Sequence, residues 1–316
     1  MMSVRSRFSA VVCVMVCAFV VGCSSPADKK TIVRLGYLQN DLHHLPAFVA
    51  LEKDFFTREG ITVEVAGIFR AGPEEMSAFA ARELDIGYVG QAPATAAVLN
   101  DTADVQFVSQ VNLEGSAIVV KEGSMYKELS DLAEKTVAIP GHATMQDFLL
   151  RRALATCNIS PDRVKLIVLK PPEMIQALAL DNIDAFIAWE PYPSQALHKG
   201  IGRILIESSA IWKDHPCCVL VARTDFCTSF PDKIEKIKAV HNRACSFITN
   251  NREEAVGIGM KYTGMDRKTV LSAMSRIQYV PHIDRDKGGA FIDFLRNLRY
   301  IRKESKKRSI NDFIFD

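Results

Sequence analysis

The sequence lacks the short motifs that mark several large classes of enzyme. It has no P-loop for nucleotide phosphates, no glycine fingerprint for a dinucleotide and no convincing Ser-His-Asp order. It also shows no cysteine beside a base that could activate it as a nucleophile. Because these absences argue against covalent chemistry, we expect neither enzyme activity nor a cofactor.

The chain also has no large surplus of positive or negative charge. The chain has 39 Lys and Arg against 37 Asp and Glu, and two of the basic residues, Arg5 and Arg7, lie in an N-terminal leader. A chain so close to neutrality has no bulk charge with which to bind phosphates, so we expect no nucleic-acid partner. Only residues 296–308 are locally basic, where a solvated helix face and a contact with anionic lipid headgroups are both open.

The apolar run near the N-terminus is too short for a membrane span, which needs roughly 20 apolar residues. Residues 8–21 follow two arginines, and the run leads into a Val-Val-Gly-Cys sequence over residues 20–23. This order predicts a signal peptide over residues 1–22. The ending resembles a bacterial lipobox, which implies that Cys23 carries a lipid. Residues 23–30 would then tether the protein to the periplasmic side of a bacterial membrane.

Cysteines at metal-binding spacings are absent. Cys13 and Cys17 leave with the leader, so the mature cysteines other than Cys23 are Cys157, Cys217, Cys218, Cys227 and Cys245. An odd number cannot pair completely, and we interpret them as small buried hydrophobes. An extracytoplasmic location leaves disulfide pairing among them open. Since the chain has no dense histidine cluster, we also expect no metal site.

What the sequence does have is an internal repeat. Residues 73–93 align without a gap on residues 172–192. Each copy opens a helix with Pro-Glu, continues into a short apolar strand after an Asp, and ends in a loop. Two units built in the same order suggest two lobes that hold a ligand between them.

The segments around the repeat alternate between strand and helix patterns. Strands are predicted at residues 32–37, 61–65 and 86–89 in the first unit, and at 136–139 and 164–169 in the second. Helices are predicted between them, notably over residues 45–56 and 144–157. This order predicts an α/β fold with a mostly parallel sheet in each lobe.

Two further apolar strands, at residues 116–120 and 218–222, are predicted to connect the lobes. Residues 31–118 and 222–316 would form lobe 1, and residues 119–221 would form lobe 2. Ligands of open α/β sheets bind beyond the carboxyl ends of the strands. That rule selects the loops at 37–44, 90–93, 141–144 and 189–192.

Three stretches together resemble a known family. They are Leu35-Gly36-Tyr37, the helix end Leu51-Glu52-Lys53-Asp54-Phe55-Phe56 before Glu59-Gly60-Ile61, and Glu83-Leu84-Asp85-Ile86-Gly87. In this order they resemble the periplasmic substrate-binding proteins of ABC importers, in the branch for sulfonates, taurine, nitrate and thiamine precursors, which includes the NMT1-like proteins.

The resemblance implies a two-lobed fold of the type II periplasmic-binding-protein kind, also called a Venus flytrap. A monomer would close on a small molecule and deliver it to an ABC permease and its ATPase. Taurine-like or alkanesulfonate-like molecules and thiamine-precursor pyrimidines both fit the resemblance. An enzyme on the same fold, similar to a pyrimidine synthase or a lyase, and a sensor lipoprotein without transport are the alternatives.

The loop before the second-lobe helix is the first predicted ligand contact. Unpaired N–H groups and the positive end of a helix dipole hold anionic groups. Thr144 could instead simply cap the helix. Glu190 is the second predicted contact, because a carboxylate in a cleft needs a cation such as a ligand amine. A structural hydrogen bond across its loop is the alternative, and nitrate would be disfavoured unless a basic residue compensates.

Aromatic and polar side chains in the same loops complete the predicted site, although the aromatic rings could equally pack between the lobes. The predicted ligand-binding residues are Tyr37, Asn40, His43, His44, Gly90, Gln91, Gly141, His142, Ala143, Thr144, Trp189, Glu190 and Tyr192.

Overall fold

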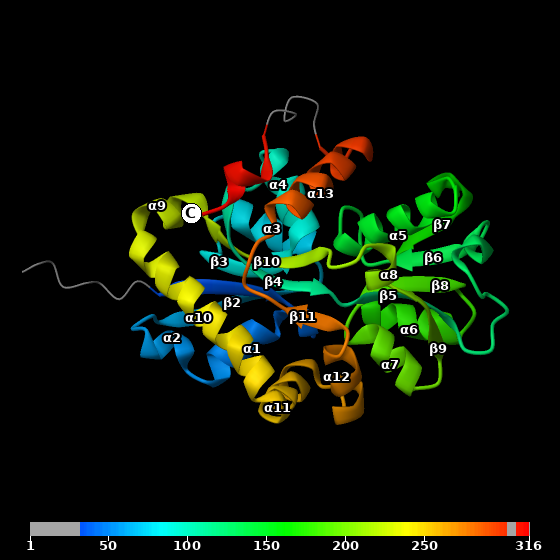
Figure 1. Cartoon of the computed structure of the whole chain (residues 1–316), viewed down its shortest axis with the longest axis horizontal. Coiled ribbons are helices and arrows are strands. Elements are labelled where there is room, and N and C mark those ends of the chain that lie inside the picture. Colours follow the sequence, from blue (N-terminus) through cyan, green and yellow to red (C-terminus); the bar gives the residue numbers. More distant parts are fainter. Residues whose placement is uncertain (1–31, 302–307, 316) are drawn as a thin grey trace, which may run out of the picture. The chain divides into compact units, whose positions relative to one another are not determined.

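The strands of the protein form two separate sheets (Figure 1). A computed structural model describes residues 32–301 and 308–315, so the predicted leader, Cys23 and the tether lie outside the described residues. The strands are β1 (Val33–Leu38), β2 (Val63–Phe69), β3 (Ile86–Gly90), β4 (Val105–Glu114), β5 (Ser116–Lys121), β6 (Thr136–Ile139), β7 (Lys165–Val168), β8 (Ala185–Trp189), β9 (Gly202–Glu207), β10 (Pro216–Arg223) and β11 (Ile277–Tyr279).

The helices surround both sheets. The α-helices are α1 (Leu45–Glu52), α2 (Phe55–Arg58), α3 (Gly72–Ala80), α4 (Gln91–Leu99), α5 (Met145–Thr156), α6 (Pro171–Ala179), α7 (Tyr192–His198), α8 (Ser208–Ile211), α9 (Thr224–Ser229), α10 (Pro231–Asn250), α11 (Arg252–Thr263), α12 (Arg267–Met274) and α13 (Arg285–Asn297). Short 3-10 turns are η1 (Leu42–His44), η2 (Leu129–Leu132), η3 (Pro161–Arg163) and η5 (Ile310–Phe313).

The first sheet has six strands in the order β11-β4-β10-β3-β1-β2. Strand β1 pairs in parallel with both β2 and β3, as the alternation of strands and helices predicts. Strand β10 runs antiparallel between β3 and β4, and β11 runs antiparallel to β4. Helix α3, which follows β2, therefore begins beyond the carboxyl end of a parallel strand.

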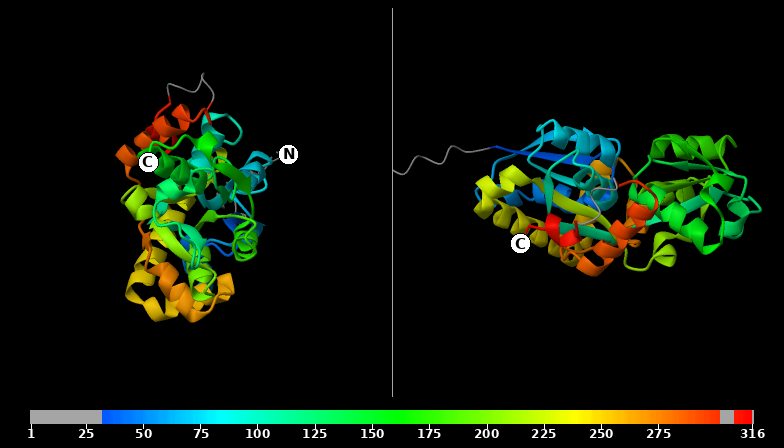
Figure 2. Two further views of the ribbon diagram at one scale, coloured as in Figure 1. Left: turned by 90° about the vertical axis from the view of Figure 1, so that its right-hand side faces the viewer. Right: turned by 90° about the horizontal axis from the view of Figure 1, so that it is seen from above.

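The second sheet has five strands in the order β7-β6-β8-β5-β9. Strand β6 lies parallel to β7 and β8, and β5 runs antiparallel to β8 and β9. In the right-hand view of Figure 2 the green segments, which form this sheet and its helices, gather into one group beside the rest. The α/β architecture with two sheets is confirmed, but the prediction that each sheet is mostly parallel was wrong. Antiparallel pairings outnumber parallel ones in the first sheet and equal them in the second, because β5, β10 and β11 run against the other strands of their sheets.

The internal repeat folds as predicted. Helices α3 and α6 and strands β3 and β8 occupy matching positions in the two copies, with one constant offset at every boundary. Both strands are largely buried, so the shared part of the repeat supplies an interior strand and its preceding helix to each sheet.

Several predicted boundaries were wrong, and the strand over residues 61–65 is observed two residues later and extends to Phe69 as β2. The helix over residues 45–56 is split, because Asp54 adopts a left-handed conformation with φ 55° between α1 and α2. The loop over residues 90–93 is instead the start of α4, with Gly90 at the N-cap and Pro93 inside the first turn. Proline suits a first turn because its missing N–H has no partner there.

The chain passes between the sheets at Gly115. This glycine separates β4 from β5 and has φ +85°, a conformation that other residues rarely adopt. A Cβ atom here would lie 2.4 Å from Nε2 of His43. The chain returns between β9 and β10, by way of α8. The division into lobes at residues 118 and 222 stays a prediction.

An aromatic cluster joins the C-terminal helix to the second sheet's helix α5. The ring of buried Phe148 in α5 has its centroid 4.7 Å from that of Phe291 and 4.4 Å from that of Phe294, both in α13. Within residues 32–301 and 308–315, no helix is long and apolar enough to cross a membrane.

Buried His241 of α10 should make the stability of the protein depend on pH. Its Nε2 lies 2.8 Å from the carbonyl oxygen of Gln110, and its Nδ1 lies 3.1 Å from the Tyr88 hydroxyl. Burial lowers the pKa of His241 to about 4, from an ordinary value of 6.5. The stability from this neutral imidazole is therefore fully present above pH 6.5 and is lost as the pH falls toward 4.

We expect the wild type to lose roughly 2 kcal/mol more unfolding free energy than His241→Gln when the pH falls from 7.5 to 5. Urea denaturation of both proteins at both pH values measures the difference. Carboxylates titrate alike in the two proteins, so the comparison isolates His241. Equal losses in the wild type and the variant would contradict the assignment.

Candidate functional site

A small cavity of about 20 Å³ lies where loops and helix starts of both sheets meet. Its lining residues stand at or beside strand ends and helix starts: Leu38, Asp41, His43, Gly72, Gly90, Pro93, Thr144, Met145, Gln146, Trp189, Cys217 and Cys218. Each of the four loops selected from the sequence, in its predicted range, supplies at least one of these residues. The meeting of loops at one place follows from the parallel strands β1, β3, β6 and β8.

Helices α3, α4 and α5 all begin at this cavity. Gly72 opens α3, Gly90 caps α4, and Thr144 caps α5. The first N–H groups of a helix have no carbonyl partner within the helix, and the helix dipole adds positive potential at this end. The helix starts from both sheets therefore favour a negatively charged group in the cavity.

Thr144 combines the two roles that the sequence left open. Its side-chain oxygen accepts a hydrogen bond from the N–H of Asp147 at 3.2 Å, and its hydroxyl donates to the carbonyl of Gly141 at 2.8 Å. The capping role is confirmed. Because Thr144 also lines the cavity, capping does not prevent a contact with a ligand.

The predicted ligand-binding residues divide into two groups. His43, Gly90, Thr144 and Trp189 line the cavity. The others lie outside its lining: Tyr37, Asn40, His44, Gln91, Gly141, His142, Ala143, Glu190 and Tyr192. A contact between any of these residues and a ligand stays a prediction.

The residues outside the lining have other surroundings. Tyr37 packs edge-on against Phe48, with ring centroids 5.1 Å apart. Tyr192 packs edge-on against Trp189 at 6.1 Å. His142 is exposed, whereas Gln91 is fully buried and both polar atoms of its amide lack a hydrogen-bond partner.

Glu190 is paired with a cation of the protein itself. It is fully buried, its Oε2 accepts a hydrogen bond from the N–H of Ser194 at 3.1 Å, and its Oε1 lies 3.5 Å from a guanidinium nitrogen of Arg276. Burial raises the pKa of Glu190, while the charge of Arg276 opposes the rise. A ligand amine is thus not needed to balance this carboxylate, and the compensating basic residue is Arg276.

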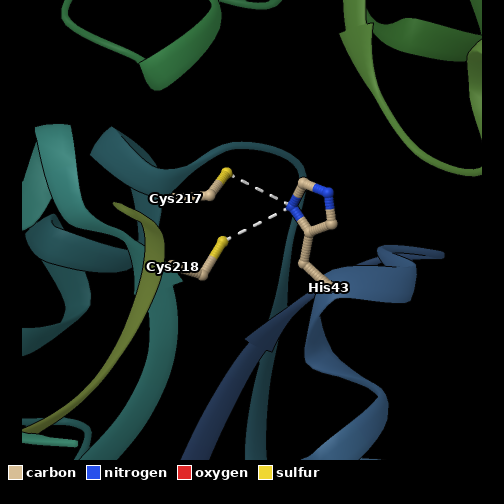
Figure 3. A group of neighbouring side chains, drawn as sticks. All are labelled: His43, Cys217 and Cys218. Carbon is tan, nitrogen blue, oxygen red and sulfur yellow. Dashed lines mark hydrogen bonds between the residues drawn. The ribbon is translucent and has the colours of Figure 1, made fainter. Parts of the chain in front are cut away.

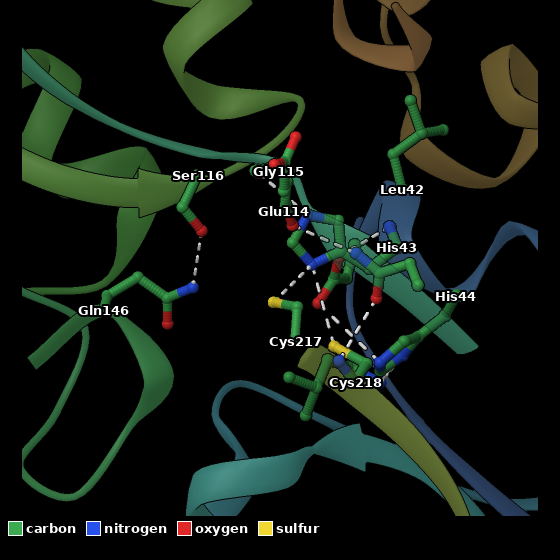
Figure 4. Close-up of polar contacts among 12 residues, drawn as sticks. Leu42, His43, His44, Glu114, Gly115, Ser116, Gln146, Cys217 and Cys218 are labelled. Atoms are coloured by element: carbon green, nitrogen blue, oxygen red, sulfur yellow. Dashed lines mark hydrogen bonds and ion pairs between the residues drawn. The ribbon is translucent and has the colours of Figure 1, made fainter. Parts of the chain in front are cut away.

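Leu38, Asp41 and Pro93 lie in the loops selected from the sequence but were not in the predicted ligand-binding set. The lining residues outside the selected loops are Gly72, Met145, Gln146, Cys217 and Cys218. The helix-start rule could have found Met145 and Gln146, since they follow the Thr144 cap. Gln146 donates through Nε2 to the hydroxyl of Ser116 at 3.0 Å (Figure 4), so it ties α5 to β5.

A buried imidazole faces two thiols in the lining of the cavity. The Sγ atoms of Cys217 and Cys218 lie 3.5 and 3.6 Å from Nδ1 of His43 (Figure 3). The expectation that no cysteine stands beside a base was therefore wrong. The sequence separates His43 from the cysteines by most of the chain, and only the pairing of β10 with β3, beside β1, brings them together.

The charges of Cys217, His43 and Asp41 shift one another's pKa values. A hydrogen bond from Cys218 and the nearby His43 hold the pKa of the Cys217 thiol well below its usual range. Burial alone would lower the pKa of His43, but the charges of Cys217 and Asp41 raise it to about 9. Burial raises the pKa of Asp41 to about 7, against the opposing charge of His43.

Two α/β sheets that enclose a cavity between their strand-end loops define the class of two-lobed solute-binding proteins. The model of the NMT1-like family matches residues 26–258. The chain is 29% identical over 289 residues to a Bacillus subtilis protein provisionally named as aliphatic sulfonates-binding, covering 87% of this chain and 84% of the relative. It is 31% identical over 194 residues to the taurine-binding periplasmic protein of Escherichia coli, covering 60% and 59%.

The fold agrees with a solved structure of the same class. The alkanesulfonate-binding protein SsuA from Xanthomonas axonopodis pv. citri, bound to MOPS, superposes with a TM-score of 0.78 at 19% identity, covering 92% of this chain and 99% of that one. This likeness concerns the fold alone. The chain belongs to the NMT1-like family, and its role is to bind a ligand.

Proposed function

We propose that this protein is a lipid-anchored, extracytoplasmic receptor that captures a small sulfonate and delivers it to an ABC permease. The observation that carries the proposal is the convergence of the α3, α4 and α5 N-termini on one cavity. Relatives named for taurine and for aliphatic sulfonates support the same ligand class.

The sulfonate would be held by backbone N–H groups rather than by arginine or lysine. Among the described residues that line the cavity, none is Arg or Lys. Gln91, Met145 and Gln146 follow the helix caps and offer first-turn N–H groups. His43 lines the same cavity, and the charges of Cys217 and Asp41 beside it raise its pKa to about 9.

The organic part of the ligand would lie against Trp189. This side chain is buried at the end of β8 and presents an apolar ring to the cavity. Because Arg276 already offsets Glu190, the ligand needs no amine. Simple alkanesulfonates should therefore bind as well as taurine, and nitrate is no longer disfavoured by Glu190.

The described conformation corresponds to a closed state. A cavity of about 20 Å³ holds roughly one water molecule, which is too small for a sulfonate. The starts of α4 and α5 must therefore move apart before a ligand enters. The lipid on Cys23 would keep the receptor beside its permease during this cycle.

Calorimetry with taurine, ethanesulfonate, nitrate and a hydroxymethyl-aminopyrimidine tests the proposal on the purified protein. We expect both sulfonates to bind and to raise the free energy of unfolding by about 2.7 kcal/mol at a concentration of 100 times Kd. Binding of the pyrimidine or of nitrate alone would contradict the sulfonate assignment.

A second candidate function, an enzyme on the same fold, is favoured by the contact between Cys217 and His43. A thiolate beside an imidazolium is the usual form of a nucleophilic cysteine. Mass spectrometry of each ligand after incubation with the protein separates the two functions. Unchanged ligand supports the receptor, and turnover supports the enzyme.

A further inference from the structure

We propose that His43, Cys217 and Cys218 form a binding site for Zn²⁺ or a cation of similar chemistry. Cys217 and Cys218 enter from β10, and His43 enters from the turn after β1, as Figure 3 shows. All three side chains are buried, and their ligand atoms lie within 4.8 Å of one another. The sequence alone predicts no such site, because no fixed spacing links the three residues.

The distances suit tetrahedral coordination. Zinc lies about 2.3 Å from a thiolate sulfur and about 2.0 Å from an imidazole nitrogen, so a tetrahedral angle separates the two ligand atoms by roughly 3.5 Å. The observed separations between Nδ1 of His43 and the two Sγ atoms are 3.5 and 3.6 Å. One cation can therefore contact the three atoms with little movement of the backbone.

A β-bulge allows two consecutive cysteines to face the same imidazole. Successive side chains of a regular strand point to opposite faces of the sheet. The register between β10 and β4 shifts between Pro216 and Cys218 and again between Cys218 and Val219, which leaves Cys217 without a partner in β4. Such a bulge redirects side chains, so both sulfurs point toward His43.

The imidazole of His43 is oriented as a metal ligand. Its Nε2 lies 2.8 Å from the carbonyl oxygen of Gly115, which accepts a hydrogen bond from the Nε2–H group and leaves Nδ1 directed at the sulfurs. Histidines that bind metals commonly donate their second N–H to a backbone carbonyl in this way. The close approach requires glycine at position 115, where a Cβ would lie 2.4 Å from Nε2.

The fourth coordination position faces the cavity. Residues His43, Cys217 and Cys218 all line the cavity of about 20 Å³, which has room for roughly one water molecule. The carboxylate of Asp41 adds negative charge, with Oδ1 3.7 Å from Nδ1 of His43. Three protein ligands and one exchangeable position describe an open zinc site.

The donor set selects the kind of cation. Two sulfurs and one imidazole nitrogen suit zinc or cuprous copper and disfavour magnesium and calcium, which prefer oxygen. Binding of Zn²⁺ displaces two protons in total from the two thiols and the imidazole, so uptake weakens at low pH. The site does not depend on the solute, because its three ligands are protein atoms.

The pair formed by His241 and Cys245 provides a matched control. There the Sγ of Cys245 lies 3.5 Å from Nε2 of His241, at a distance like those in the proposed site. Both ring nitrogens, however, are engaged by Gln110 and Tyr88, and no second thiol shares the imidazole among the described residues. Cys245→Ser should therefore leave metal binding unchanged.

The test uses the reduced, chelator-treated protein and titrates it with Zn²⁺ against a chromophoric chelator. We expect one Zn²⁺ per chain, no binding of Mg²⁺, and a loss of affinity of roughly 100-fold or more in Cys217→Ser, Cys218→Ser and His43→Gln. In the wild type, Co²⁺ should give the visible bands of a tetrahedral ion and a thiolate charge-transfer band.

Three results would overturn the proposal. They are a Zn²⁺ affinity that the two cysteine variants leave unchanged, a Co²⁺ spectrum without thiolate charge transfer, and no Zn²⁺ uptake by the reduced wild type. The Co²⁺ spectrum needs no variant, so it tests thiolate coordination in the wild type even if a substitution impairs folding. Solute binding is measured separately, so its failure would not count against the metal site.

Discussion

Replacing Arg276 with methionine is expected to destabilise the protein by about 3 kcal/mol, because it leaves the buried carboxylate of Glu190 without its cation. Arg276 also donates through Nε to Glu207 at 2.9 Å and through Nη1 to the hydroxyl of Ser194 at 3.1 Å. One guanidinium thus joins the segment after α12 to the strand end at β9 and the helix start at α7.

The loss should grow as the pH rises. Burial raises the pKa of Glu190 above its ordinary value of 4.5, so the folded protein holds a proton there more tightly than the unfolded chain. A raised carboxyl pKa contributes stability below pH 4.5 and loses it as the pH rises through the folded pKa. Removing Arg276 raises that pKa further, so the gap between variant and wild type should be larger at pH 8 than at pH 5.

Urea denaturation at these two pH values measures the effect. Adding Glu190→Gln to Arg276→Met tests whether the unpaired carboxylate causes the loss. This double variant has no unpaired charge at the site, so most of the lost stability should return. Arg267→Met in α12 is the control, since its pairing with Glu253 is exposed and should be worth less than about 1 kcal/mol. An Arg276→Met effect no larger than the control would refute the role of the pair.

The order of strands and helices could be predicted because it follows from patterns among neighbouring residues. The repeat predicted α3 with β3 and α6 with β8, since helix starts, apolar runs and turn residues are all properties of neighbouring positions. The same logic placed the strand-end loops together. The start of α4 was missed because Gly90 and Pro93 are typical of loops, yet both also suit the first turn of a helix.

The polar pairings of the site could not be predicted, because they join residues far apart in the chain. Arg276 reaches Glu190 from the end of α12, and no local pattern connects the two. Cys217 and Cys218 follow one another in an apolar strand, where alternation would send one of them away from the cavity. Only the bulge in β10 places both beside His43.

Replacing Gly90 with leucine is expected to reduce solute affinity by roughly 100-fold or more, since the new side chain would fill the cavity that the solute must occupy. A Cβ at Gly90 would lie 3.2 Å from Cδ of Pro93 and 3.9 Å from Cγ of Met145, so the branched chain would stand between the starts of α4 and α5. It would also hold apart the two helix N-termini that close on the anion.

The fold should survive this substitution. Gly90 has φ −58° and ψ 137°, a conformation open to leucine, so the change strains no backbone angle. The loss of glycine at an N-cap should reduce stability by only about 1 kcal/mol.

Gly257→Leu in α11, where a Cβ meets nothing within 4 Å, is the matched control and should bind the solute like the wild type. Calorimetry with the tightest binder among taurine, ethanesulfonate, nitrate and the pyrimidine compares the three proteins. An affinity of Gly90→Leu within tenfold of the control would mean that the solute is held elsewhere than between α4 and α5.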